Sequence, residues 1–128
     1  MKQNYIDEFV ELGRGILHGY SEESFRRKER FHSLGKKVCR ALADALGLSK
    51  GSYDVRSNKG GTAVAGEVTL HAENLYIQFS DCALRRGFMV RPCKGRKDYC
   101  GGVNNWVDYS ALFNFKRGVE EIKNLLKI

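Results

Sequence analysis

The sequence predicts an α+β fold in which two N-terminal helices, a four-stranded antiparallel β-meander and a C-terminal helix pack with the helices on one sheet face. Three observations predict it. Apolar residues recur every three or four positions near both ends of the chain, and every second position between residues 53 and 92. Glycine-rich connections separate the alternating runs. Because 128 residues is the length of one domain, we expect a single α+β domain over residues 1–128.

The helices are predicted from their apolar stripes and their caps. A first helix is expected over residues 4–20, with Asn4 as its N-cap. A second begins at Ser21 and ends at Gly47, because glycine favours a left-handed C-terminal cap. A third helix covers residues 114–128, with an asparagine as its first residue and cap.

Two-residue alternation predicts the strands and their faces. The strands are expected over residues 53–58, 64–71, 74–80 and 87–93. A connection at residues 72–73 would pair Leu70 with Leu75, and Pro92 would make the last strand an edge or a strand end. The helices should cover Val55, Val68, Leu70, Leu75, Ile77, Phe79 and Val90. The opposite, polar face should carry Arg56, Glu67, Thr69, His71, Tyr76, Gln78 and Arg91.

Charge and composition limit the classes of partner. With 22 Lys and Arg against 15 Asp and Glu, the chain has a net charge of +7, which favours nucleic acid, phosphorylated small molecules or an acidic protein surface. The alternative is a surface charge that serves only solubility. No apolar run resembles a secretory signal or a membrane span, so we expect a cytoplasmic protein with reduced cysteines and no membrane partner.

Two cationic, glycine-rich segments, "RSNKGGTA" and "RPCKGRKDYCGGVNNW", follow strands of the predicted sheet. Such segments can direct backbone N–H groups and cations at phosphate oxygens. Lys94, Arg96 and Lys97 are too clustered for each to find its own carboxylate, so we expect them to act on a ligand through electrostatics. The predicted register places Arg56 and Arg91 near the strand ends that lead into both segments, so we expect both segments and the polar face to form one phosphate-binding site. The predicted ligand-binding residues are Arg56, Asn58, Lys59, Gly60, Gly61, His71, Tyr76, Gln78, Arg91, Lys94, Gly95, Arg96, Lys97, Tyr99, Gly101, Gly102, Asn104, Asn105 and Trp106.

Alternatives remain open at three places. The polar face could be the ordinary solvated side of an antiparallel sheet. Trp106 could stack on a base or anchor the core beneath the loop, and the second interpretation is slightly favoured. A secondary basic face on the long helix could contact the ligand or be a solvated helix face, as Asp44 on the same side suggests. That basic face comprises Arg26, Arg30, Lys37 and Arg40.

The cysteines do not have the spacing of a metal site. Cys82, Cys93 and Cys100 lack the close C-x-x-C pair of structural zinc sites, even with His71 as a fourth ligand. Buried thiols or a disulfide between Cys93 and Cys100 are favoured over zinc. We therefore expect neither a metal nor a cofactor.

The sequence lacks the common catalytic motifs. The sequence contains no P-loop, no dinucleotide-binding glycine motif, no nucleophile elbow and no deaminase signature. His71, Asp98 and Tyr99 could act as acid and base on a bound phosphodiester. Whether the protein is an enzyme stays open, with a non-enzymatic role favoured and a small phosphodiesterase or nuclease as an alternative.

"SNKGGTAVAGEVTLHAENLYIQFS" followed by "CKGRKDYCGGVNNW" resembles small proteins of unassigned function encoded by tailed bacteriophages, over residues 53–106. The resemblance implies a phage accessory protein in the host cytoplasm and brings no catalytic residues. The leading hypothesis is a protein that binds a phosphate-bearing ligand, nucleic acid first and a small nucleotide second. The alternative is an inhibitor or sponge that acts against host defence by binding a host protein or a nucleotide signal. The oligomeric state is not predicted.

Overall fold

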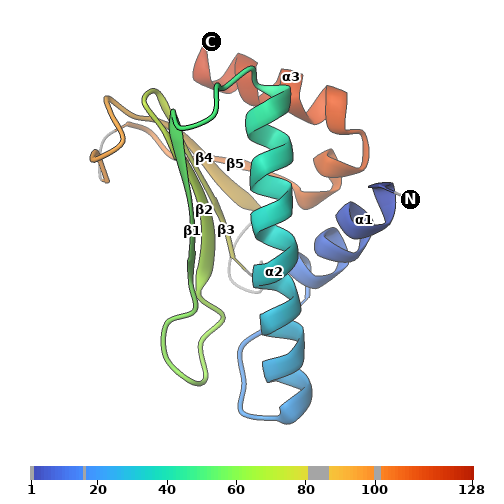
Figure 1. The fold of residues 1–128 in the computed structure, drawn as a ribbon. Helices are drawn as coiled ribbons and strands as arrows, with labels where there is room; N and C mark the ends of the chain where they lie inside the picture. Colours follow the sequence, from blue (N-terminus) through green and yellow to red (C-terminus); the bar gives the residue numbers. More distant parts are fainter. Residues whose placement is uncertain (1, 16, 81–86, 100–101) are drawn as a thin grey trace.

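The elements follow one another as helices, then strands, then helices, and the helices lie on one side of an antiparallel sheet (Figure 1). The computed structural model describes residues 2–15, 17–80, 87–99 and 102–128. The elements are α1 (Lys2–Gly13), α2 (Glu22–Ala45), β1 (Tyr53–Asn58), β2 (Glu67–Ala72), β3 (Leu75–Phe79), β4 (Phe88–Pro92), β5 (Asn105–Val107), the 3₁₀ helix η1 (Tyr109–Phe113) and α3 (Phe115–Leu126). The predicted α+β class is confirmed. The sheet has five strands rather than four, because the short β5 pairs with β4.

Helix α1 is shorter than predicted. It begins at Lys2, so Asn4 lies within the helix and is not its cap, and it ends at Gly13 rather than at residue 20. Gly13 and Gly15 explain the early end, because glycine is a poor helix former. Gly13 also lies directly against the ring of Tyr109, where a larger residue would overlap it.

The predicted caps of the other helices are confirmed. The side chain of Ser21 accepts a hydrogen bond from the backbone N–H of Ser24 at 3.0 Å, which begins α2. Helix α2 ends at Ala45, and Gly47 follows in the left-handed conformation. Asn114 caps α3 by accepting from the N–H of Arg117 at 3.3 Å. Local sequence therefore determines both of these helix starts.

The sheet runs in the order β1-β2-β3-β4-β5, and each neighbouring pair is antiparallel. Leu70 pairs with Ile77 rather than with Leu75, because β2 continues to Ala72 and the connection to β3 falls at residues 73–74. This shift of two residues changes every pair but leaves each side chain on its predicted face, since side chains alternate with a period of two. Pro92 ends β4, which is not an edge strand because β5 lies beyond it.

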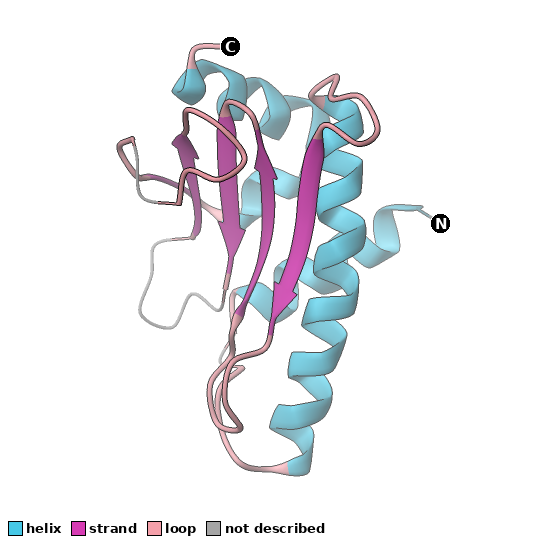
Figure 2. Ribbon diagram, turned by 60° about the vertical axis from the view of Figure 1, so that its left-hand side comes forward, coloured by secondary structure: helices cyan, strands magenta, loops and turns pink. Residues whose placement is uncertain are grey.

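The core fills the space between the sheet and the helices. Helix α2 packs on β1 and β2, while α3 packs on β4. Phe9 of α1 stacks on Phe31 of α2 with ring centroids 4.8 Å apart and meets Phe79 of β3 edge-on at 5.2 Å. Figure 2 looks onto the other side of the sheet, which no helix covers. No helix in the described part of the chain is long and apolar enough to span a membrane.

Candidate functional site

The side chains on the polar face of the sheet form two neighbouring rows that run across the strands. Strand pairing places Asp54, His71, Tyr76 and Arg91 in one row across β1 to β4. The next row crosses all five strands and consists of Arg56, Thr69, Gln78, Met89 and Trp106. We call these nine residues the polar face. Arg56, His71, Tyr76, Gln78 and Arg91, all expected at the site, therefore lie together on the helix-free side.

Aromatic rings and guanidinium groups alternate across the polar face. The guanidinium of Arg56 lies over the ring of Tyr99 at 5.5 Å, and that of Arg91 lies over the ring of Tyr76 at 4.5 Å. His71 stands between the two tyrosines and meets both edge-on, with centroids 5.2 Å from Tyr99 and 5.0 Å from Tyr76. This stack joins the sheet to the segment that follows β4.

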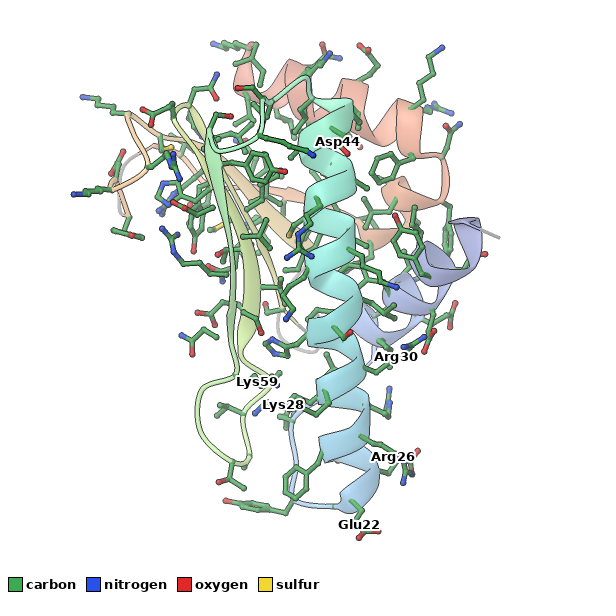
Figure 3. The ribbon with its side chains drawn as sticks, viewed as in Figure 1. Glu22, Arg26, Lys28, Arg30, Asp44 and Lys59 are labelled. Carbon is green, nitrogen blue, oxygen red and sulfur yellow. The ribbon has the colours of Figure 1, made fainter. Side chains whose placement is uncertain are left out.

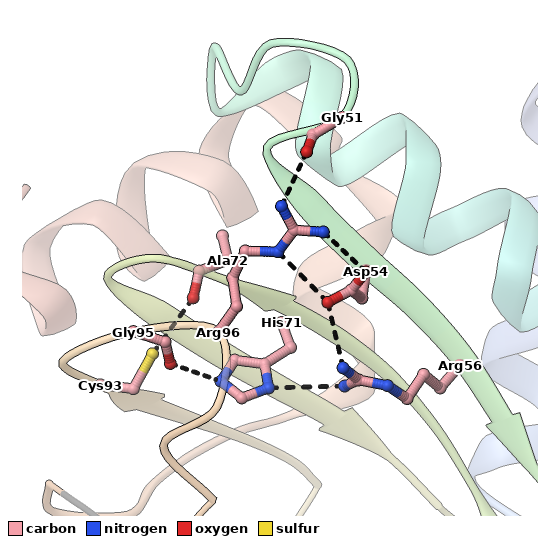
Figure 4. Close-up of polar contacts among 8 residues, drawn as sticks. All are labelled: Gly51, Asp54, Arg56, His71, Ala72, Cys93, Gly95 and Arg96. Carbon is pink, nitrogen blue, oxygen red and sulfur yellow. Dashed lines mark hydrogen bonds and ion pairs between the residues drawn. The ribbon is translucent and has the colours of Figure 1, made fainter.

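That segment, residues 93–99, folds back over the polar face, and we call it the strap. Arg96 fastens it to β1, donating to the two carboxylate oxygens of Asp54 at 2.7 and 3.2 Å and to the carbonyl of Gly51 at 2.7 Å (Figure 4). Within the strap, the N–H of Lys94 donates to the carboxylate of Asp98 at 3.0 Å. Of the three clustered cations, Arg96 therefore does have a carboxylate partner, because the fold brings Asp54 to it.

His71 also holds the strap. Its Nε2–H donates to the carbonyl of Gly95 at 3.0 Å, which leaves Nδ1 as an acceptor 3.4 Å from a guanidinium nitrogen of Arg56. Burial lowers the pKa of His71, and the neighbouring charges of Arg56 and Arg91 lower it further. Both of its ring nitrogens are engaged, so its geometry does not support the predicted acid or base role.

Arg91 is the least satisfied charged group in this region. The residue is only 8% exposed, and its buried Nε has no hydrogen-bond partner among the described residues. None of the ion pairs of the described residues includes it. The ring of Tyr76 attracts the cation but accepts no in-plane hydrogen bond, and the hydroxyl of Tyr76 donates instead to Gln78 at 3.1 Å. Burying a cation without an acceptor is costly, so this position needs an explanation.

An open pocket of about 520 Å³ lies between the strap and β1. It is lined by Asp54, Arg56, Glu73, Gly95, Arg96, Lys97 and Tyr99. Asp54 accepts from Arg56 at 3.0 Å as well as from Arg96, so two guanidinium groups converge on one carboxylate. The hydrogen bond from Arg96, together with the charges of Arg96 and Arg56, holds the pKa of Asp54 below its usual value.

The other glycine-rich segment, the hairpin loop of residues 59–66, lies at the opposite end of the sheet (Figure 1). Lys59 forms an ion pair with Glu29 of α2 at 2.7 Å. Lys28, which Figure 3 shows beside Lys59, donates to the carbonyl of Gly61 at 2.9 Å. The side-chain oxygen of Asn58 accepts from the N–H of Gly60 at 3.1 Å. This loop is docked on α2, so the prediction of one site containing both segments is wrong.

Three chain reversals separate the two segments. The hairpin loop follows β1 and the strap follows β4. Consecutive antiparallel strands run in opposite directions, so their carboxyl ends lie alternately at one end of the sheet and at the other. An odd number of reversals places the segments at opposite ends. Asn58, Lys59, Gly60 and Gly61 therefore do not belong to the site that contains Arg91.

The predicted site residues between the strap and the end of β5 lie in different environments. Trp106 pairs with Met89 on the polar face and is 37% exposed, so the core-anchor interpretation is wrong. Asn105 pairs with Val90 on the helix side and donates to the carbonyl of Val103 at 3.3 Å. Asn104 is exposed, whereas Gly102 lies directly against the carbonyl of Pro92. The call on Gly101 falls outside the described residues.

The predicted basic face of α2 is partly engaged by α1. Arg30 donates two hydrogen bonds of 2.8 Å to the carboxylate of Glu8, and Lys37 lies 5.9 Å from the ring centre of Tyr5. Arg26 and Arg40 are exposed. Figure 3 shows Arg26 and Arg30 on the long helix, away from the strap. These four residues form no continuous surface with the polar face.

The two described cysteines, Cys39 and Cys93, contact only other parts of the fold. Cys39 is fully buried in the core, and burial raises the pKa of its thiol. The thiol of Cys93 donates to the carbonyl of Ala72 at 3.3 Å. Cys82 and Cys100 lie outside the described residues, so the disulfide and zinc alternatives that involve them stay predictions. Within the described ranges, no three His, Cys, Asp or Glu side chains are grouped to hold a metal.

Sequence reasoning did not include Asp54 among the site residues, although it is the acceptor shared by Arg56 and Arg96. Strand alternation already placed Asp54 beside Arg56 on the outward face, and that signal was available. The bacteriophage resemblance stays a prediction. Comparisons of this chain with protein-family models, with curated proteins and with solved structures find no match.

Proposed function

We propose that the protein binds a phosphate-bearing ligand on the polar face, with single-stranded nucleic acid ahead of a small nucleotide. The observation that carries the proposal is Arg91, a residue only 8% exposed whose buried Nε has no hydrogen-bond partner and whose guanidinium has no carboxylate partner among the described residues. A phosphate oxygen would supply the missing acceptor. Arginine suits this role because its planar fork matches the oxygens of phosphate.

The surroundings of Arg91 favour a ligand with planar rings. Tyr99 and Trp106 are partly exposed near the two edges of the polar face, and bases of any sequence can stack on such rings. Gln78 and Thr69 add hydrogen-bonding groups between them. Bases within a duplex are not available for stacking, so these rings favour single strands or free nucleotides.

The net charge of the chain supports a polyanionic ligand over a single small anion. A charge of +7 attracts a polyanion from a distance and strengthens its binding at low salt. The same surface would serve a sponge for a nucleotide signal, as the sequence also suggested. A role as a phage accessory protein in the host cytoplasm remains a prediction.

A protein partner is the second candidate, and it would use the other end of the molecule. Tyr20 is 78% exposed, and Phe25 and Val64 are also exposed near the start of α2 and on the hairpin loop. The N–H of Gly19 donates to the carbonyl of Ala63 at 2.9 Å, which holds these two segments together. Exposed aromatic side chains are enriched at protein interfaces.

The test compares Arg91→Met with Lys59→Met, which remove the same charge from opposite ends of the sheet. Binding of a fluorescent single-stranded oligonucleotide is measured by anisotropy at low salt. Arg91→Met should weaken binding about 10- to 100-fold, the range for a hydrogen bond to a charged group. Lys59→Met should change it less than about threefold, because Lys59 is paired with Glu29.

Stability separates a binding role from a structural one. Removing a buried cation that lacks an acceptor should leave the unliganded protein as stable as before, or slightly more stable. Urea denaturation of both variants measures this. An Arg91→Met variant that unfolds more easily and binds the oligonucleotide as well as the parent would contradict the proposal.

A further inference from the structure

The pocket between the strap and β1 contains an acceptor held in an arrangement typical of a bound phosphate. One carboxylate, that of Asp54, accepts from Arg96 at 2.7 and 3.2 Å and from Arg56 at 3.0 Å. The two arginines come from different segments, the strap and β1, and share Oδ2 of this carboxylate, while Arg96 also donates to Oδ1 (Figure 4). Paired guanidinium forks around a few oxygens are also how arginines bind phosphate.

The charges around the pocket favour an additional anion. Its lining contains three cations, Arg56, Arg96 and Lys97, against two carboxylates, Asp54 and Glu73. Lys97 forms no ion pair with a described residue. A phosphate carries more acceptor oxygens than a carboxylate, so it can satisfy both guanidinium groups and Lys97 at once.

We infer that this pocket is a second phosphate subsite of the ligand-binding face, occupied in the free protein by the carboxylate of Asp54. A phosphate group of the ligand takes the place of Asp54 as the acceptor for Arg56 and Arg96. The inference rests on the proposed function, because the same ligand places another phosphate at Arg91. Asp54 is then an internal competitor that reduces the affinity of the free protein.

The surrounding contacts permit this exchange without loss of the strap. Arg96 keeps its bond to the carbonyl of Gly51, and His71 keeps its bond to the carbonyl of Gly95. The side chain of Asp54 is 35% exposed, so it can turn toward water when the phosphate enters. Tyr99 lines the pocket and touches His71, which connects the subsite to Tyr76 and Arg91 through the stack.

The experiment compares Asp54→Asn with Glu73→Gln, because both remove one negative charge from the pocket lining. Binding of inorganic pyrophosphate is measured by calorimetry at one salt concentration. Asp54→Asn should bind pyrophosphate about tenfold tighter than the parent, since it removes the internal competitor. Glu73→Gln should gain less than about threefold, because no arginine donates to Glu73 among the described contacts.

Hydrogen exchange of the strap supplies a second readout. Without ligand, the amide of Asp98, which donates to Gly95, should exchange faster in Asp54→Asn than in the parent. Pyrophosphate should restore its protection, because the phosphate replaces the lost carboxylate between the arginines. Arg96→Gln should abolish both the tighter binding and the restored protection.

Equal or weaker pyrophosphate binding by Asp54→Asn would overturn the subsite, as would protection that pyrophosphate does not restore. The single-stranded oligonucleotide separates this failure from failure of the proposed function. If the oligonucleotide binds the parent and depends on Arg91 while Asp54→Asn gains nothing, only the subsite is wrong. If the oligonucleotide binds neither the parent nor Asp54→Asn, the proposed function fails and the subsite with it.

Discussion

The hairpin loop and the strap have similar compositions and different environments. They belong to the two longer segments, residues 56–63 and 91–106, that are both cationic and rich in glycine, and both follow strands of one sheet. The cations of the hairpin loop region are used within the fold, since Lys59 pairs with Glu29 and Lys28 bonds to Gly61. The strap lies over a polar surface that contains Arg91, which has no such partner among the residues that the structure describes.

This difference shows that the role of a basic loop depends on what the fold places opposite it. The hairpin loop meets a helix that supplies a carboxylate, and the result is a docked connection. The strap meets a sheet face with more cations than carboxylates, and the result is a surface that still attracts anions. Glycine content alone does not distinguish the two.

The largest expected effect comes from replacing a glycine in each loop region. Gly66 has a φ of 72°, and a Cβ there would overlap the carbonyl oxygen of Asn58. Gly66→Ala should lower the free energy of unfolding by about 2 kcal/mol or more, because alanine strains the backbone at this φ and its Cβ overlaps a hairpin that is docked on α2. Urea denaturation measures the change.

Gly102 provides the matched substitution near the strap. Its φ is 81°, and a Cβ would overlap the carbonyl oxygen of Pro92. Because residue 102 is exposed and lies in a loop, Gly102→Ala should loosen the strap locally and weaken ligand binding, with a smaller loss of global stability. Equal loss of global stability in both variants would remove the distinction between the two loops.

Salt concentration should have an intermediate effect on the affinity for a single strand. If Arg91, Arg96 and Lys97 contact three phosphates of a single strand, affinity should fall about 20-fold between roughly 50 and 200 mM salt. Arg91→Met should reduce this dependence, and Lys59→Met should not change it. Anisotropy titrations at several salt concentrations measure the slope. An affinity independent of salt would exclude phosphate contacts by the strap.

A smaller effect on stability is expected from pH, and histidines at both ends of the sheet should contribute to it. Burial is the main cause of the lowered pKa of His71 at the strap and of His32, which bonds to Ser57 and Ala65 beside the hairpin loop. Arg56 and Arg91 face His71, while the charges of Lys28, Glu29 and Lys59 act on His32.

The pKa of each imidazole is lower in the folded protein than in the unfolded chain, so the unfolded chain takes up protons first as pH falls. Their contribution to stability is therefore complete above pH about 6.5 and is lost as pH falls through the folded pKa values. Asp54, whose pKa is also lowered, should keep its contribution until the solution is considerably more acidic. Denaturation between pH 7.5 and 5 should show declining stability, with a shallower decline in His71→Gln. A flat profile would contradict the neutral, buried histidines.

The sequence predicted the starts of the second and third helices and the strand faces well because these depend on short-range patterns. Ser21, Asn114 and Gly47 act within a few residues of themselves, and their roles were confirmed. The two-residue shift that pairs Leu70 with Ile77 has no effect on alternation, so no pattern could reveal it. Strand β5 has only three residues, which is too short for a periodic signal.

The site was harder to predict because its contacts join distant parts of the chain. Arg96 and Asp54 are 42 residues apart, and Lys59 and Glu29 are 30 apart. Composition identified both loops as basic, but it could not show which one meets a carboxylate from a helix. The burial of Arg91 depends on the whole sheet, and local sequence carries no signal for it.

The central claim is that Arg91 and the strap receive the ligand while the hairpin loop does not. An NMR titration of the ¹⁵N-labelled protein with a single-stranded oligonucleotide tests it directly, since it follows backbone amides and arginine Nε–H groups together. The Arg91 Nε–H signal and the amides of residues 93–99 should move, while those of residues 59–62 stay in place. Movement at residues 59–62 with an unchanged Arg91 signal would contradict the account.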